Sequence, residues 1–149
     1  MPIKPRLSLP PPPATLVGMS DAERKIGGGA VFALADVKAH VAEAHINGLN
    51  LATQKASDDL NFELSWRLSD VCKFISCLDK CFYRYSEWVY GSDRAKVAYP
   101  ADVYIMGYNR MKEKEWPQAN PWNYFKFSFS SHNNTIEIFS IHLENVKQN

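Results

Sequence analysis

The chain has 149 residues, of which 46% are hydrophobic and 22% charged, and its formal net charge is +1. These values are typical of one globular domain with a single core. The small net charge excludes a protein that binds nucleic acid through its overall charge, and no apolar run approaches the roughly 18 to 20 residues of a membrane helix.

The first thirty residues differ in composition from the rest. Residues 1–30 hold six of the nine prolines and the glycine run Gly27–Gly29, with few large apolar side chains. This composition predicts a flexible extension ahead of a folded domain at residues 31–149. The start "MPIKPRLSLPPPPATL" is basic, but prolines interrupt what would be the apolar core of a secretory signal. We therefore expect a cytoplasmic protein.

Two helical patterns follow this extension. In "FALADVKAHVAEAHI", residues 32–46, apolar residues recur at spacings of three and four, which predicts an amphipathic helix. In "ELSWRLSDVCKFISCL", residues 63–78, a second apolar stripe runs from Leu64 to Leu78. Between them, "LNLATQKASDDLNF" predicts a short extended piece and then a short helix capped by Thr53.

After residue 78 the helical period gives way to strict alternation. Aromatic and β-branched residues dominate these segments, and such residues favour strands. Helices followed by strands indicate an α+β fold, in which an antiparallel sheet is packed by the N-terminal helices. The segments are "KCFYRYSEWVY", "ADVYIMGY", "WNYFKFSFS" and "TIEIFSIHL".

The three cysteines form no recognisable site. Cys72, Cys77 and Cys81 contain no C-x-x-C pair, and an odd number does not indicate a disulfide framework. Free cysteines are among the most buried residues, so we expect structural thiols in a reducing compartment. The sequence predicts neither a metal nor a cofactor.

Two long connections, residues 91–100 and 109–121, are where binding groups are expected, because such groups concentrate on loops. In the second connection, basic side chains could meet phosphates beside a ring that could stack on a base. A solvated loop, in which two glutamates cancel part of the charge, explains the same residues. The candidate RNA-binding residues are Arg110, Lys112, Lys114 and Trp116.

The segment "NPWNYFKFSFSSHNNTIEIFSIHLE", residues 120–144, predicts a β-hairpin with a polar face. Tyr124 and Lys126 are two residues apart and share that face, whereas the phenylalanines that alternate with them point into the core. On the return strand, strict alternation places His142 on the same face as Ile138. If the register brings His142 opposite Tyr124, a phenol, an ammonium and an imidazole converge.

Such a set suits RNA cleavage without a metal. That reaction needs a base for the 2′-hydroxyl, an acid for the leaving 5′-oxygen and cations for the phosphorane-like transition state. His142 can act as acid or base near neutral pH, whereas Tyr124 and Lys126 need help from their surroundings. Arg84 could complete the site, because a guanidinium binds phosphate through two hydrogen bonds. Any half-exposed hairpin also carries polar residues on its solvent face, so a face without catalytic function explains the same residues.

The order of these segments resembles the MqsR family of toxins, which are relatives of the RelE-type messenger-RNA interferases of bacterial toxin–antitoxin systems. The similarity lies in the ordered succession of short pieces over most of residues 33–144. The matching pieces are "LADVKAHV", "ATQKASDDLNF", "SDVCKFISCLDKCFYRYS", "ADVY" and "YFKFSFSSHNNTIEIFSIHLE".

The resemblance implies a compact RelE-like ribonuclease that cuts single-stranded messenger RNA without a metal and is neutralised by a cognate antitoxin. Tyr124 falls on the family's site tyrosine and Lys126 on the lysine that follows it. Arg84 stands where the family has a functional lysine, and His142 stands near another lysine. Ala101 replaces a family glutamine, and this loses a hydrogen-bonding amide.

Two alternatives remain open from the sequence. The loss at Ala101 is also expected of a catalytically inactive domain of the same fold that binds RNA or an antitoxin. An unrelated α+β interaction protein that pairs through an exposed sheet edge would produce a tight protein partner and no RNA product.

Overall fold

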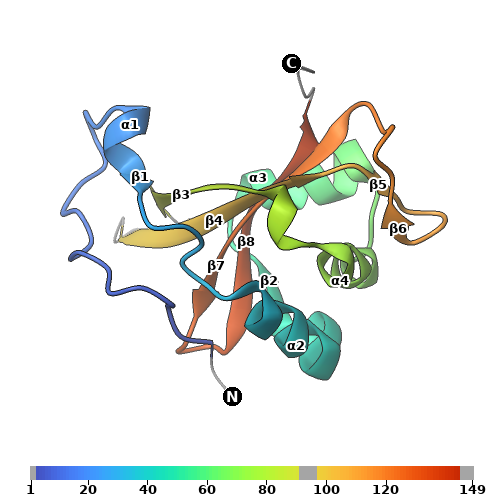
Figure 1. Ribbon diagram of the computed structural model, residues 1–149, viewed down its shortest axis with the longest axis horizontal. Coiled ribbons are helices and arrows are strands. Elements are labelled where there is room, and N and C mark those ends of the chain that lie inside the picture. Colours follow the sequence, from blue (N-terminus) through green and yellow to red (C-terminus); the bar gives the residue numbers. More distant parts are fainter. Residues whose placement is uncertain (1–2, 91–96, 145–149) are drawn as a thin grey trace.

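The computed structural model describes residues 3–90 and 97–144, and they form a six-stranded sheet with helices packed on it and a small two-stranded sheet (Figure 1). The helices are α1 (Asp21–Arg24), α2 (Leu34–Ala44), α3 (Gln54–Asp58) and α4 (Leu68–Cys77), with shorter or irregular turns η1 (His45–Gly48), η2 (Asp59–Leu64) and η3 (Lys80–Phe82). The strands are β1 (Lys25–Ile26), β2 (Leu49–Leu51), β3 (Tyr83–Tyr90), β4 (Ala98–Met106), β5 (Tyr108–Asn109), β6 (Lys114–Glu115), β7 (Trp122–Ser130) and β8 (Thr135–Glu144).

The main sheet has six strands in the order β1-β3-β4-β7-β8-β2. All neighbours are antiparallel except β2, which runs parallel to β8 at one edge. The four long strands match the four alternating segments of the sequence. The predicted α+β fold, with a mostly antiparallel sheet and packed helices, is therefore confirmed.

The core lies between the sheet and the helices α2 and α4, which pack beside each other (Figure 1). Phe74 of α4 contacts Phe125 of β7 edge to face, with ring centroids 5.7 Å apart. Phe125 and Phe127 are fully buried and stack on each other, as their alternation with Tyr124 and Lys126 predicts. The helix-facing side of the hairpin thus supplies the centre of the core.

The predicted caps and helix starts agree with the structure in part. Thr53 caps α3, because its hydroxyl accepts a hydrogen bond from the N–H of Ala56 at 3.0 Å. The second long helix begins only at Leu68, whereas Leu64 ends the irregular turn η2. Ser65, which follows η2, adopts a left-handed backbone with φ of 54°, and this change of direction separates the two elements.

The N-terminal segment is not a separate flexible extension over its described residues. Ile3, Leu16 and Ile26 are buried in the same core cluster as the helices. β1 pairs with β3, and a bridge joins Pro5 to the backbone just ahead of α2. A few apolar side chains between the prolines are enough to anchor the segment in the core.

A β-bulge in β8 changes the faces predicted for the return strand. Phe127 pairs with Ile138, but the preceding pair on the ladder is Lys126 with Ser140, so Phe139 is an extra residue. Beyond this bulge the alternation shifts by one position. The prediction that His142 shares a face with Ile138 is therefore wrong: Ile138 faces the core, and His142 lies on the opposite side with Lys126's partner Ser140.

Among the described residues, no helix is both long and apolar enough to cross a lipid bilayer.

Candidate functional site

The sheet face opposite α2 and α4 carries the predicted hairpin residues. Tyr124 of β7 pairs directly with His142 of β8, and their rings stack with centroids 4.6 Å apart and planes 17° apart. The register therefore brings the phenol and the imidazole together, a condition that the sequence alone left open. We refer to Tyr85, Glu87, Tyr124, Lys126 and His142 together as the open-face cluster.

Tyr124 is held as a neutral phenol. Its hydroxyl lies 3.0 Å from the hydroxyl of Tyr85, and the side chain is largely buried. Burial, the hydrogen bond to Tyr85 and the nearby carboxylates of Glu87 and Glu144 all raise the pKa of Tyr124. At neutral pH this side chain is therefore a neutral hydrogen-bond donor and not a base.

Lys126 already has an anionic partner. Its ammonium lies 3.0 Å from one oxygen of Glu87, and the ammonium of Lys25 lies 2.9 Å from the other. Burial raises the pKa of Glu87, but the hydrogen bonds and charges of the two lysines outweigh it and hold that pKa below its usual value. Two ammonium groups and one carboxylate leave this trio with one net positive charge.

Lys25 also connects this trio to the aromatic part of the open-face cluster. Its ammonium stands 3.6 Å from the centroid of the Tyr85 ring. A cation over an aromatic face is attracted by the negative face of the ring. β1, which comes from the segment expected to be flexible, thus contributes a charged group to the candidate site.

His142 lies between two carboxylates. Its Nε2 is 3.0 Å from Glu144, and its Nδ1 is 3.7 Å from Asp59 and 3.4 Å from the ammonium of Lys55. The side chain is 20% exposed, so a ligand on this face can reach it. Both ring nitrogens of His142 therefore have polar neighbours, and the carboxylate of Glu144 fixes the orientation of the ring.

Arg84 is not brought to this cluster by any hydrogen bond. It sits in a β-bulge of β3, between the paired residues Tyr83 and Tyr85, and it is exposed. One guanidinium nitrogen donates to the carbonyls of Cys81 and Tyr83, each at 3.3 Å. The bulge releases Arg84 from the regular alternation, which is the physical reason that its side chain is held by nearby backbone.

The loop residues predicted to bind RNA form a separate group. β5 and β6 make a small hairpin that packs against α4, where Arg110 lies 3.8 Å from Asp70 and Lys73 pairs with Glu113. Trp116 is about half exposed. Over residues 3–90 and 97–144, no hydrogen bond, ion pair or ring contact links this hairpin to the open-face cluster. Lys112 and Lys114 are exposed in the same hairpin.

The other predicted loop, residues 91–100, lies partly outside the described residues, which begin again at residue 97, and β4 starts at Ala98.

Ala101 lies on the open face, where the resemblance expects an amide. It pairs with Glu87 on β3 and is completely buried. A methyl group here can pack but can neither donate nor accept a hydrogen bond. The position is therefore next to the candidate site, and the missing amide is a real difference from the expected set of groups.

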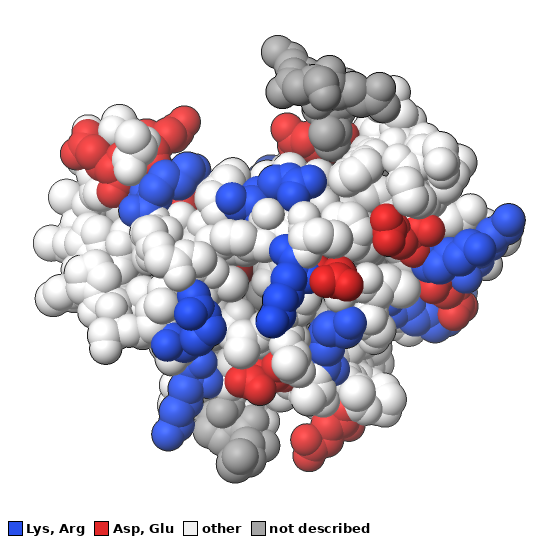
Figure 2. Space-filling model, viewed as in Figure 1, with Lys and Arg blue, Asp and Glu red and all other residues white. Residues whose placement is uncertain are grey.

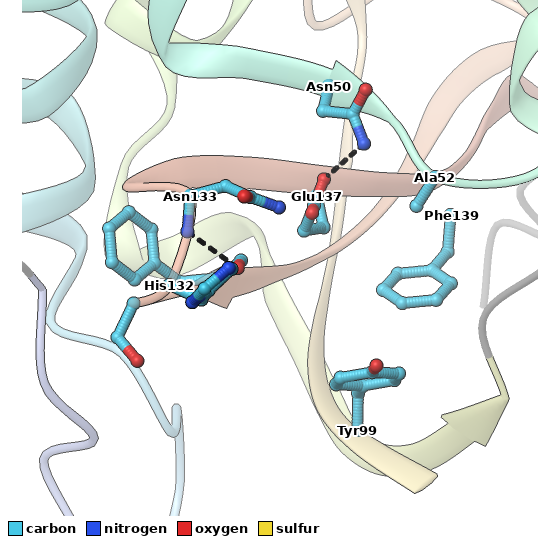
Figure 3. Close-up of a pocket in the computed structure, with 10 residues that line it drawn as sticks. Asn50, Ala52, Tyr99, His132, Asn133, Glu137 and Phe139 are labelled. Carbon is cyan, nitrogen blue, oxygen red and sulfur yellow. Dashed lines mark hydrogen bonds between the residues drawn. The ribbon is translucent and has the colours of Figure 1, made fainter. Parts of the chain in front are cut away.

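A hollow of about 550 Å³ lies on the open face toward the turn of the β7–β8 hairpin (Figure 3). Glu137 accepts a hydrogen bond from Asn50 at 2.7 Å, and the rings of Tyr99 and Phe139 lie 6.3 Å apart along its floor. His132 reaches it from the turn. This hollow combines aromatic surface with polar groups, and sequence reasoning did not identify it.

No continuous basic surface is visible among the described residues on the face shown in Figure 2, where Lys and Arg are separated by acidic and uncharged side chains. The described part of the chain also contains no group of three His, Cys, Asp or Glu side chains placed to hold a metal ion. Of the three cysteines, Cys72 and Cys77 are half-buried against the core, but Cys81 is exposed, contrary to the expected buried thiol.

Glu87 is the main residue that sequence reasoning missed. The signal was present, because Glu87 is two residues from Tyr85 in "YRYSEWVY" and alternation places both on one face. A single carboxylate among aromatic and apolar residues of a central strand needs a cationic partner if it is buried. The partner could not be identified without the strand order.

A comparison with protein-family models, curated proteins and solved structures finds no match to this chain, so the resemblance to the MqsR family stays a prediction.

Proposed function

We propose that the protein is a metal-independent endoribonuclease toxin that cleaves single-stranded messenger RNA in the cytoplasm and is neutralised by a cognate antitoxin. The observation that carries this proposal is the stacked pair of Tyr124 and His142 beside Lys126 on one sheet face. The pair places an imidazole next to a neutral phenol. The lysine trio with Glu87 adds one net positive charge to the same face.

In this proposal, His142 is the proton-transfer group. It takes the proton of the 2′-hydroxyl, and the resulting oxyanion attacks the adjacent phosphorus and expels the 5′-oxygen. The products are a 2′,3′-cyclic phosphate and a free 5′-hydroxyl, once the leaving oxygen has received a proton. Tyr124 donates a hydrogen bond to the reacting phosphate, because its raised pKa keeps the phenol protonated. The leaving oxygen takes its proton from water, and His142 then releases the proton it has taken to solvent.

Lys126 and Lys25 are the cations for the phosphate. An incoming phosphate would share their ammonium groups with Glu87, which lies within 3.0 Å of both. Arg84 and the hairpin residues Arg110, Lys112, Lys114 and Trp116 are proposed contacts to flanking RNA. These contacts would add affinity outside the reacting phosphate.

The experiment is a digestion of a long, defined messenger RNA by purified protein in EDTA, with cuts mapped by primer extension. We expect His142→Gln to lower the cleavage rate by about 10²- to 10⁴-fold, the range typical of lost acid–base catalysis. Tyr124→Phe should lower it by about tenfold or more. The matched control is His132→Gln, an exposed histidine in the hairpin turn. Equal cleavage by all four proteins would reject the proposed site.

A second candidate is a domain of the same fold that binds RNA or an antitoxin without turnover. It is favoured by the ion pair that occupies Lys126 and by the methyl group at Ala101. It predicts that the folded protein, freed of any partner, retains labelled RNA on a filter but yields no cuts. Co-purification of a small protein that blocks this retention would then identify the partner.

A further inference from the structure

A second hollow, of about 390 Å³, lies on the helix side of the sheet at the N-terminus of α2. Its polar wall is formed by Arg6, Lys80, Tyr83 and Tyr104, and its apolar wall by Phe32 and Leu34 with neighbouring alanines. We call it the α2 hollow. None of these residues belongs to the open-face cluster, so a ligand site here is independent of the proposed ribonuclease activity.

The first turn of α2 presents unused donors. The first N–H groups of an α-helix have no partner inside the helix, and a side-chain cap normally satisfies one of them. Here the cap position is Ala33, which has no side chain that can accept, and over the described residues the N–H groups of Leu34 and Ala35 make no hydrogen bond. An uncapped helix N-terminus favours an anion through these N–H groups and through the helix dipole.

Tyr104 is the second, independent indication of a ligand. It is 1% exposed and lines the α2 hollow, and within the described residues its hydroxyl has no hydrogen-bond partner. A hydroxyl with so little exposure and no partner in the described protein can be satisfied only from the hollow, either by water or by the acceptor of a ligand. Burial and the charge of Asp102 raise the pKa of Tyr104, so its phenol is a donor.

Two cations stand at the same hollow. The guanidinium of Arg6 is fixed by hydrogen bonds to the carbonyls of Ala30 at 3.0 Å and Gly28 at 2.7 Å, which use two of its three nitrogens. Lys80 is exposed, and no described group pairs with its ammonium. The third nitrogen of Arg6 and the ammonium of Lys80 can therefore reach an anion.

The buried carboxylate of Asp102 interacts with the charge of Arg6 and offsets part of it, but it presents no free oxygen to the α2 hollow. Asp102 is fully buried and accepts hydrogen bonds from the N–H groups of Val31 at 2.8 Å and Phe32 at 3.0 Å and from Ser86 at 2.6 Å. Both oxygens of Asp102 therefore already accept hydrogen bonds from the protein, and burial raises the pKa of this carboxyl group. Asp36 lies in the first turn of α2 but does not line the hollow.

We propose that the α2 hollow binds a phosphate monoester, with the phosphate at the first turn of α2 and an apolar or aromatic body against Phe32 and Leu34. The donors outnumber what a planar carboxylate can accept, whereas three phosphate oxygens can use the two N–H groups, the phenol and the two cations. The hollow has the size of a small-ligand site.

The test is a titration of the isotope-labelled full chain with phenyl phosphate, followed through the amide NMR signals of Leu34 and Ala35. We expect saturable shifts of these signals. Tyr104→Phe should weaken binding by about tenfold, because it removes one hydrogen bond to a charged group, and Lys80→Gln by about threefold, because its charge is exposed.

Matched controls are Tyr108→Phe, which removes a buried tyrosine hydroxyl that has no partner among the described residues and lies outside the α2 hollow, and Lys73→Gln at an exposed position of α4. Both should bind phenyl phosphate as the wild type does. Absence of saturable shifts, or equal weakening in the controls, would overturn the site. Binding of inorganic phosphate as tight as that of phenyl phosphate would overturn the role of the apolar wall. Retained NMR spectra of the variants would show that they fold.

Discussion

The substitution Glu87→Gln tests the charge arrangement of the open-face cluster. Glu87 bridges two ammonium groups, at 2.9 Å from Lys25 and 3.0 Å from Lys126. The side chains of Glu87 and Lys126 are only 14% and 19% exposed, whereas that of Lys25 is 38% exposed. Glutamine keeps the shape and one acceptor oxygen, so the change removes the charge and little else.

The expected loss of stability near pH 7 is about 2 kcal/mol. A hydrogen bond between charged groups contributes about 1.5 to 3 kcal/mol when it is shielded, which describes Lys126, and an exposed pair contributes below about 1 kcal/mol, which describes Lys25. Glutamine retains part of each bond. The remaining cost comes mainly from leaving the Lys126 ammonium without its counter-charge.

The pH dependence has a definite sign. The pKa of Glu87 is below its ordinary value of 4.5, so between the two values the unfolded chain binds more protons than the folded chain. Stability from Glu87 is therefore complete above pH 4.5 and is lost as the pH falls through the lowered value. The difference between the wild type and Glu87→Gln should shrink from about 2 kcal/mol near pH 7 toward zero as the pH falls below the lowered pKa of Glu87.

Urea denaturation of both proteins at several pH values measures this difference. The control is Glu137→Gln, which changes a carboxylate on the same face whose partner is the neutral amide of Asn50. The reasoning is refuted if Glu87→Gln is as stable as the wild type near pH 7, or if the difference stays constant while the pH falls. A pH-dependent difference of the same size in Glu137→Gln would also assign the effect to general surface charge.

Two further substitutions test the core. Asp102→Ala should cost about 3 to 4 kcal/mol in urea denaturation, because three donors lose a buried acceptor, whereas the exposed Asp58→Ala should change stability by less than about 0.5 kcal/mol. A loss below about 1 kcal/mol for Asp102→Ala would contradict the buried network. Phe74→Ala should cost about 3 to 5 kcal/mol because Phe74 is fully buried, and Phe62→Ala, at an 80% exposed ring, should be nearly neutral in the same assay. Equal losses for the two phenylalanines would contradict the packing of α4.

Sequence periodicity predicted the long strands and α2 because each buries one regular face. Which residues of β8 face the core could not be predicted in the same way along the whole strand. The bulge at Phe139 carries no local signal, since a strand with one extra residue still alternates on each side of it. The convergence of His142 and Tyr124 depends on that bulge, because an unbroken register would turn His142 toward the helices.

The N-terminal segment shows a different limit of sequence reasoning. Proline and glycine content predicted a flexible extension there, but composition does not reveal whether isolated apolar residues pack against the rest of the protein. Ile3 and Leu16 do so in the core. Lys25 and Arg6 then reach two candidate sites on opposite faces of the sheet. Long-range contacts of this kind have no sequence period.

The two edges of the sheet have a consequence for self-association. One edge is β1, only two residues long, and the other is β2, only three. Beyond β2, the carboxylates of Asp59 and Glu63 accept hydrogen bonds from the backbone N–H groups of Ile141 and Leu143. These N–H groups of β8 are therefore not free to pair with a strand of another chain. Short and blocked edges resist edge-to-edge aggregation, and a protein partner is therefore expected to approach a face of the sheet instead of extending it.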